Sequence, residues 1–427
     1  MNFELEEISL QEAVEFVVDN RGKSAPTVEK GIKLIATSCI SNTNLYPSYE
    51  QVRFVSLETY ENWFRSHPQT GDIILTNKGS QNGAICLVPD PVDFCIAQDM
   101  VALRANQKKI DPLYLFAALR SNLVQSRIKN LNVDAVIPHF KKTDFDKLLI
   151  PLPTRCIQEK IGEFYYNTCL KIELNRRMNE TLEEMARAIF KDWFIDFGPT
   201  RAKQAGRAPY LPEPLWSLFP EAIDDETGLP IGWREGTIGE CFNLTMGQSP
   251  PGSTYNDTGE GLPFFQGRTD FGFRFPENRK YCSAPTRIAE PDDTLISVRA
   301  PVGDINMAWE RCCIGRGVSA LRHKSYSRSF TYYSAWAIQE ELHNYEHTGT
   351  VFGAINRNQF MALPTIEPNN ESFITLFDNY VASMDDLIKE NVNESRTLAE
   401  TRDRLLPKLM SGEIRVKEAE KMVEEAL

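Results

Sequence analysis

The short motif Arg21-Gly22-Lys23-Ser24 ends like a phosphate-binding loop, and it is the strongest hint of catalytic chemistry in the chain. A loop of that kind also needs a glycine five residues before Gly22, because its backbone amides must wrap closely around the phosphates. Position 17 is Val17, so we expect no nucleotide site here.

Metal and catalytic motifs are missing elsewhere. His343 and His347 are separated by Asn-Tyr-Glu, which is not the HExxH pattern, and the chain has only five histidines. No Asn/Asp-Pro-Pro-aromatic sequence is present, which an amino-methyltransferase would use to hold a flipped base. Pro291-Asp292 lacks the Glu/Asp-x-Lys partner of a nuclease, and no GxSxG elbow occurs. We therefore predict no catalytic residues and no metal site.

Composition favours a globular protein of the cytoplasm. The 427 residues are 42% hydrophobic and 25% charged, enough for two domains with real cores. No signal-peptide pattern or apolar run long enough to span a membrane is present. The nine cysteines form no CxxC pair, which favours reduced and mostly buried thiols.

The distribution of charge permits DNA binding without demonstrating it. The net charge is −12, but residues 20–150 and 262–360 each carry a small excess of Lys and Arg over Asp and Glu. The acidic excess lies in the middle of the chain and near the C-terminus. Phosphate contacts are therefore possible, with weak non-specific affinity.

Two long amphipathic helices repeat 216 positions apart, at 155–196 and 370–411. Their apolar residues recur at steps of three and four, as a coiled-coil seam requires. Thr181-Leu182-x-Glu184 returns as Thr397-Leu398-x-Glu400, and Asn175 corresponds to Asn391. About 40 residues at ~1.5 Å each make a helix of roughly 60 Å, a length typical of a spacer.

The sequence before each helix repeats more faintly. Gly22-x-Ser24 is echoed by Gly247-x-Ser249, and the strand ending in Lys78 by the strand ending in Arg299. Short strands, turns and a few helices predict two mixed α+β domains. The predicted organisation is as follows: domain 1 at 1–154, a central helix at 155–197, a Pro- and Gly-rich linker at 198–232, domain 2 at 233–369, a C-terminal helix at 370–412, and a charged tail at 413–427 that frays.

This plan of domain, long helix, domain, long helix resembles type I restriction-modification specificity subunits. The resemblance runs from about Glu6 to Val416. It is carried by Gly71-Asp72-Ile-Ile-Leu, by Leu149-Ile-Pro-Leu-Pro with the following Ile157-Gln-Glu-Lys-Ile161, and by Leu405-Leu-Pro-Lys-Leu-Met-Ser-Gly412-Glu. The first domain departs from it, since it lacks the Trp-x-x-x-x-Ile-Gly entry found at Trp233–Gly239.

The resemblance implies a non-catalytic subunit of a DNA methylation and defence complex. Each domain would be a target recognition domain reading one half of a bipartite, asymmetric double-stranded DNA sequence. The helices would form an antiparallel coiled coil. Two modification (methyltransferase) subunits, which bind S-adenosylmethionine, and restriction (translocase and nuclease) subunits, which use ATP and Mg, would assemble on it. No cofactor would bind this chain.

Side chains able to reach base edges or phosphates from loops are the candidates for DNA contact. They are Lys78, Ser80, Gln81 and Asn82 in domain 1 and Gln248, Arg268 and Arg299 in domain 2, with Lys141, Lys142 and Arg357 as phosphate anchors. For each of them an ordinary solvated side chain is an equal alternative. Asn175 and Asn391 are candidates for fixing the register of the helix seam, with exposure to solvent or to a partner subunit as the alternative.

Three other functions fit parts of the pattern. The chain could serve a related methylation-based defence system, or act as a coiled-coil scaffold that does not touch DNA. A stand-alone methyltransferase or nuclease is the third, and the missing motifs oppose it.

Overall fold

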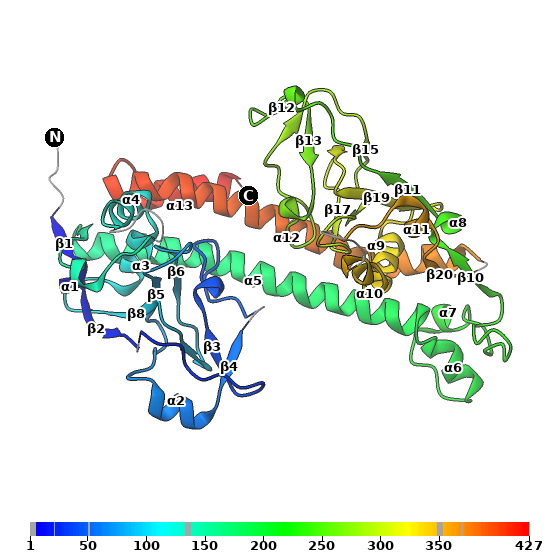
Figure 1. Cartoon of the computed structure of the whole chain (residues 1–427), viewed down its shortest axis with the longest axis horizontal. Coiled ribbons are helices and arrows are strands. Elements are labelled where there is room, and N and C mark those ends of the chain that lie inside the picture. The colour runs from blue at the N-terminus through cyan, green and yellow to red at the C-terminus, as the bar shows by residue number, and fades with distance from the viewer. Residues whose placement is uncertain are drawn as a thin grey trace. The chain divides into compact units, whose positions relative to one another are not determined.

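The computed structural model describes residues 6–20, 22–49, 52–132, 138–347, 353–368 and 370–426 (Figure 1). The chain divides into two compact units. Unit 1 comprises Met1–Met178 with Glu390–Leu427, and unit 2 comprises Asn179–Lys389. Both boundaries fall inside long helices, α5 (Arg155–Phe194) and α12 (Ser372–Ser411), so each helix contributes one part to each unit.

Unit 1 contains a four-stranded sheet of order β2-β8-β5-β6, a three-stranded sheet β4-β3-β7 and the pair β1-β9. Its elements before α5 are β1 (Glu7–Ser9), α1 (Leu10–Ala13), β2 (Val14–Val18), β3 (Ile32–Ile35), β4 (Arg53–Val55), α2 (Leu57–Trp63), β5 (Ile73–Thr76), β6 (Ile85–Leu87), β7 (Phe94–Ile96), β8 (Met100–Ala105), α3 (Pro112–Arg120), α4 (Asn122–Asn130) and β9 (Leu149–Pro151). Its core joins sheet residues such as Leu75 and Leu103 to Phe116 of α3, Ile161 of α5 and Leu405 of α12.

Unit 2 contains a four-stranded sheet β11-β19-β16-β17, a five-stranded sheet β12-β14-β13-β18-β15 and the pair β10-β20. Its elements between α5 and α12 are α6 (Gly198–Gln204), α7 (Glu213–Trp216), β10 (Trp233–Thr237), α8 (Ile238–Cys241), β11 (Phe242–Met246), β12 (Tyr255–Asn256), β13 (Leu262–Phe265), β14 (Tyr281–Cys282), β15 (Ile288–Ala289), β16 (Thr294–Ser297), β17 (Ile305–Met307), β18 (Cys312–Ile314), β19 (Val318–His323), α9 (Arg328–Ala337), α10 (Gln339–His343), α11 (Arg357–Met361) and β20 (Pro364–Pro368).

The two units have the same topology in their central strands, which confirms the mixed α/β class and the predicted repeat. Strand β3 pairs in parallel with β7, as β13 does with β18. Strand β8 lies between β2 and β5 in one sheet, and β19 lies between β11 and β16 in the other. The first strand of domain 1 is equivalent to that of domain 2 despite their loose similarity in sequence, since β1 pairs with β9 as β10 pairs with β20.

Several local expectations from the sequence were wrong. Residues 416–426 form a further helix, α13 (Val416–Ala426), whose Ala419 is fully buried in the core of unit 1, so this segment packs rather than frays. The linker contains the short helices α6 and α7 in addition to turns.

Ile157 and Met185 of α5 fit the steps of three and four that predict the helix seam, yet both are exposed, because other residues of α5 face inward. Ile157 is 45% exposed while the next residue, Gln158, is buried and accepts a hydrogen bond from the backbone N–H of Asp111. Met185 is 48% exposed, and its neighbours Glu183 and Ala186 are buried instead. The domain that packs against a helix therefore buries further residues of that helix, in addition to those of the seam between the two helices.

Eight of the nine cysteines are buried and all are unpaired, as predicted, with Cys156 the exposed one. In the described part of the chain, no helix has the length and apolar character needed to cross a membrane.

Candidate nucleic-acid interface

In domain 1 the loop between β5 and β6 carries Lys78, Ser80, Gln81 and Asn82. Gly79 and Gly83 bracket it with φ values of +91° and +88°, which residues with a side chain rarely adopt. The Asn82 N–H donates to the carbonyl of Gly79 (3.0 Å), closing a tight turn. Ser80 and Gln81 are exposed. They are therefore presented to solvent on a fixed backbone.

Asn82 is held differently from its neighbours. Its Nδ2 donates to Oδ1 of Asn132 at 2.7 Å, and the residue is half-buried. This amide therefore ties the loop to the segment after α4. Its role as a base contact stays a prediction.

Two other segments meet the strand end that carries Lys78. The Asn77 N–H donates to the carbonyl of Asp99 (3.1 Å), and the Phe140 N–H donates to the carbonyl of Asn77 (2.9 Å). Lys78 Nζ lies 3.9 Å from Asp99 Oδ1, with both side chains 43% exposed. The fold thus brings Lys78 beside the turn after β7 and beside the segment that leads to Lys141.

Lys141 and Lys142 follow that segment, and the structure separates their roles. Lys141 is exposed. Lys142 donates to Asp19, and burial lowers the pKa of its ammonium group. Lys141 is consequently the better placed of the two for contact with a phosphate.

Domain 2 repeats this arrangement with other side chains. The Val298 N–H donates to the carbonyl of Gly317 (2.9 Å), and the Ile355 N–H donates to the carbonyl of Val298 (3.1 Å). Arg299 therefore occupies the place of Lys78. Arg357, the first residue of α11, occupies the place of Lys142 in domain 1. Arg299 and Arg357 are both exposed.

Gln248 lies beside the end of β18 and has a fixed backbone. Its N–H donates to the carbonyl of Ile314 (3.0 Å), and its carbonyl accepts from Thr286 Oγ1 (2.9 Å). The side chain is exposed. The backbone hydrogen bonds therefore present the Gln248 amide to solvent from a defined position.

Arg268 lies in a more acidic setting than the other candidates. Its Nε is 2.9 Å from Asp304 Oδ2, and it lines a pocket of about 350 Å³ that also contains Glu180, Glu183 and Glu184. Burial raises the pKa of Asp304, and Arg268 opposes that rise. A paired guanidinium among carboxylates attracts a phosphate less than an unpaired one.

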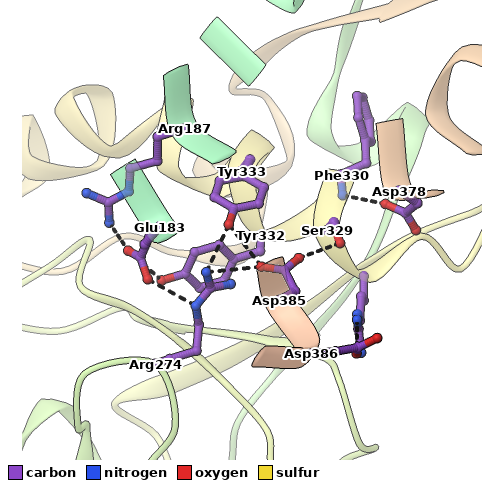
Figure 2. A network of polar contacts seen from close by, with 11 residues as sticks. Glu183, Arg187, Arg274, Ser329, Phe330, Tyr332, Tyr333, Asp378, Asp385 and Asp386 are labelled. Atoms are coloured by element: carbon purple, nitrogen blue, oxygen red, sulfur yellow. Dashed lines mark hydrogen bonds and ion pairs between the residues drawn. The ribbon is translucent and has the colours of Figure 1, made fainter. Parts of the chain in front are cut away.

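The loop after β13 is fastened to both long helices by a buried arginine that the sequence did not single out (Figure 2). Arg274 is 2% exposed, and its Nε lies 3.0 Å from Glu183 Oε2 of α5. Its Nη2 lies 3.2 Å from Asp385 Oδ1 of α12 and donates to the Tyr333 hydroxyl at 2.9 Å. The guanidinium stacks 3.9 Å from the centre of the Tyr332 ring.

The surroundings keep Arg274 charged. Burial by itself lowers the pKa of the guanidinium, but Tyr332, Tyr333 and the carboxylates of Glu183 and Asp385 raise it, and the net shift is upward. Arg187 pairs with Glu183 from the other side, as Figure 2 shows. Each buried charge thus has a partner, and the loop can take only one position without leaving a charge unpaired.

The side chain of Asn175 lies against the backbone of Asn391 and its neighbours on α12 inside unit 1. Asn175 Nδ2 lies 2.6 Å from Glu394 Oε2, 3.3 Å from Ser395 Oγ and 3.4 Å from the backbone carbonyl of Asn391. Both asparagines are buried, at 0% and 6% exposure. The contact therefore runs from the Asn175 side chain to the α12 backbone and its neighbours. That it fixes the helix register stays a prediction.

Comparison with known proteins gives one consistent family. A family model described as the type I restriction modification DNA specificity domain matches residues 28–184. A Methanocaldococcus jannaschii protein named as a type I restriction enzyme MjaX specificity subunit is 29% identical over 356 residues, covering 81% of this chain and 79% of that one. The type I restriction enzyme HindI specificity subunit of Haemophilus influenzae is 25% identical over 406 residues, covering 81% and 86%.

A solved structure agrees at the level of the fold. The type I restriction-modification system S subunit from M. genitalium aligns over 96% of this chain and 97% of its own, with 16% identity and a TM-score of 0.57. The family model and the named relatives together show that this chain is similar to type I restriction-modification specificity subunits over most of its length.

Proposed function

We propose that this chain is the non-catalytic DNA specificity subunit of a type I restriction-modification complex and reads a bipartite, asymmetric target with its two domains. One observation carries the proposal. Each domain builds the same junction of backbone segments and places a cation there, Lys78 or Arg299, next to a segment that leads to further basic residues, Lys141 and Lys142 or Arg357. The framework is shared and the exposed side chains differ, as expected of two domains that read different sequences.

The proposal includes the partners that the family resemblance implies. Two modification subunits would supply S-adenosylmethionine and methylate an adenine in each half-site, and restriction subunits would supply ATP-driven translocation and cleavage. This chain would hold no cofactor of its own and would act in the cytoplasm. The two long helices would serve as a spacer packed as an antiparallel coiled coil, because two half-sites on one face of DNA must keep helical register, which returns every ~10.5 base pairs.

The test is to express the chain with its modification subunits and to map methylated adenines in the host DNA by sequencing. We expect one bipartite motif that disappears when this chain is deleted. Unchanged methylation after the deletion would count against the proposal. A gel shift with the same complex separates it from a scaffold without DNA contact, which would give no sequence-dependent shift.

Arg299→Ala is expected to weaken recognition of one half-site only, because Arg299 belongs to domain 2. The expected loss is about 1–3 kcal/mol of discrimination if the side chain contacts a base. The measurement is competition binding with duplexes altered in either half-site. Lys78→Ala should give the mirror result in the other half-site, and equal losses at both half-sites in either variant would refute the assignment.

Replacing both Asn175 and Asn391 with leucine tests the register role. A polar residue at a seam position fixes register at some cost in stability. The double variant is therefore expected to be no less stable than the wild type but to relax the spacing between half-sites. Duplexes whose spacer is one base pair longer or shorter measure this effect, and an unchanged spacing preference would contradict it.

A further inference from the structure

The Gly-x-Ser echo of the sequence, Gly22-x-Ser24 and Gly247-x-Ser249, takes part in a contact that recurs in both domains. Ser24 Oγ accepts a hydrogen bond from Gln98 Nε2 at 3.1 Å. Ser249 Oγ accepts from Arg316, from its N–H at 3.4 Å and its Nε at 3.3 Å. In each domain the serine follows the first strand of the four-stranded sheet, and its partner lies in the turn after the parallel strand β7 or β18.

The two turns occupy equivalent places in the fold. The Ala97 N–H donates to the carbonyl of Ile35 at 2.9 Å, and the Gly315 N–H donates to that of Phe265 at 2.8 Å. One residue after Gln98, the carbonyl of Asp99 accepts from Asn77. One residue after Arg316, the carbonyl of Gly317 accepts from Val298. Gln98 is therefore the domain 1 counterpart of Arg316, although the residue types differ.

The turn in domain 2 is built so that only the side chain of Arg316 projects from it. A Cβ at Gly317 would collide with the carbonyl of Gln266, and a Cβ at Gly247 would collide with the carbonyl of Gly315. Glycines are needed at both places because backbone meets backbone directly. Arg316 is exposed and lies between Gly315 and Gly317 in the sequence. The backbone of the turn is therefore fixed, while the long side chain of Arg316 reaches solvent.

In Gln98 and Arg316 the serine hydroxyl holds one side-chain nitrogen, and the other polar atoms of the side chain are available for binding. In the part of the chain that the structure describes, the two η nitrogens of Arg316 have neither a hydrogen-bond nor an ion-pair partner, and Oε1 of Gln98 has no hydrogen-bond donor. Two parallel N–H donors suit O6 and N7 of guanine, whereas a paired carbonyl and amide suit N6 and N7 of adenine. Anchoring by serine reduces the side-chain entropy that binding would otherwise cost.

We propose that Arg316 and Gln98 are base-reading residues at equivalent positions of the two domains, with Arg316 selecting guanine in one half-site and Gln98 selecting adenine in the other. The inference rests on the proposed function and names a residue pair within it. It also accounts for the pattern of divergence. The backbone junction and the serine are kept in both domains, while the residue whose chemistry distinguishes the bases has changed.

The experiment replaces each of the two residues with the residue type of the other, in the complex with its modification subunits. Binding to duplex libraries randomised at one base pair at a time gives the preference at each position. Arg316→Gln is expected to change the preferred base at one position of the domain 2 half-site, with discrimination altered about 10- to 100-fold, and to leave the other half-site unchanged. Gln98→Arg should do the same at one position of the domain 1 half-site.

Matched variants separate reading from folding and from phosphate contact. Arg311→Ala removes another exposed arginine of domain 2, paired with Glu290 at 3.2 Å, and should change no base preference. Ser249→Ala should keep the preferred base and weaken discrimination a few-fold, because Arg316 loses its anchor. Thermal unfolding of each variant verifies that it is folded.

The outcomes distinguish this inference from the function on which it rests. If the wild-type complex shows no sequence preference, both the proposed function and the inference fail. If the wild type is specific and folded Arg316→Gln keeps every base preference, only the inference fails. A uniform loss of affinity for all sequences, with a shallower salt dependence, would identify Arg316 as a phosphate contact and overturn the inference.

Discussion

Arg274→Ala is expected to lower the free energy of unfolding of unit 2 by about 3–5 kcal/mol, because it leaves the buried carboxylate of Asp385 without its cation and that of Glu183 with Arg187 alone. Glu183 and Asp385 have side chains 6% and 5% exposed, respectively, and Arg274 lies between them. Asp385 would keep its hydrogen bonds from Ser329 and Tyr333, which cannot replace a positive charge. The midpoint of urea unfolding at neutral pH measures the loss.

A control in the same loop separates burial from charge. Arg279 pairs with Glu277 at 2.7 Å, but both side chains are more than half exposed, so Arg279→Ala should change stability by less than about 1 kcal/mol. Adding Asp385→Asn to Arg274→Ala should recover part of the loss, since it removes the buried charge that is left unpaired, whereas Glu183 keeps its ion pair with Arg187. Equal stability of the Arg274→Ala and Arg279→Ala variants would show that the buried cluster does not fasten the loop.

Phe377→Ala is the second large effect expected, with a loss of about 3–5 kcal/mol. Phe377 of α12 is fully buried, and its ring centre lies 5.4 Å from those of Phe190 and Phe194 and 5.9 Å from that of Trp193, all on α5. Removing the ring opens a cavity at the place where the two helices meet in unit 2. Surrounding aromatic rings are stiff and cannot easily fill it.

Thermal or urea unfolding measures this loss of stability, and two further variants serve as comparisons. Phe377→Leu should cost clearly less, because most of the volume is retained. Leu387→Ala on the same helix removes a side chain that is 36% exposed and should cost far less than Phe377→Ala. If Phe377→Ala were as mild as Leu387→Ala, the aromatic cluster would not be what joins these helix segments.

The sequence alone determined the features that depend on local periodicity. The two long helices follow from apolar residues at steps of three and four, and α5 and α12 span Arg155–Phe194 and Ser372–Ser411. The strands ending near Lys78 and Arg299 follow from short apolar runs between turns. The same reasoning did not find α13, because a charged amphipathic segment becomes a stable helix only when a core is available to bury residues such as Ala419.

Only the tertiary structure decided which side chains act together. Arg274 meets Glu183 across 91 positions and Ser249 meets Arg316 across 67, and no periodic pattern links residues so far apart. It also distinguished similar candidates, since Lys142 is paired with Asp19 and Arg268 with Asp304, whereas Lys141 and Arg299 have no ion-pair partner among the described residues. The physical reason is that burial and pairing set the charge a side chain offers, and both depend on neighbours brought in by the fold.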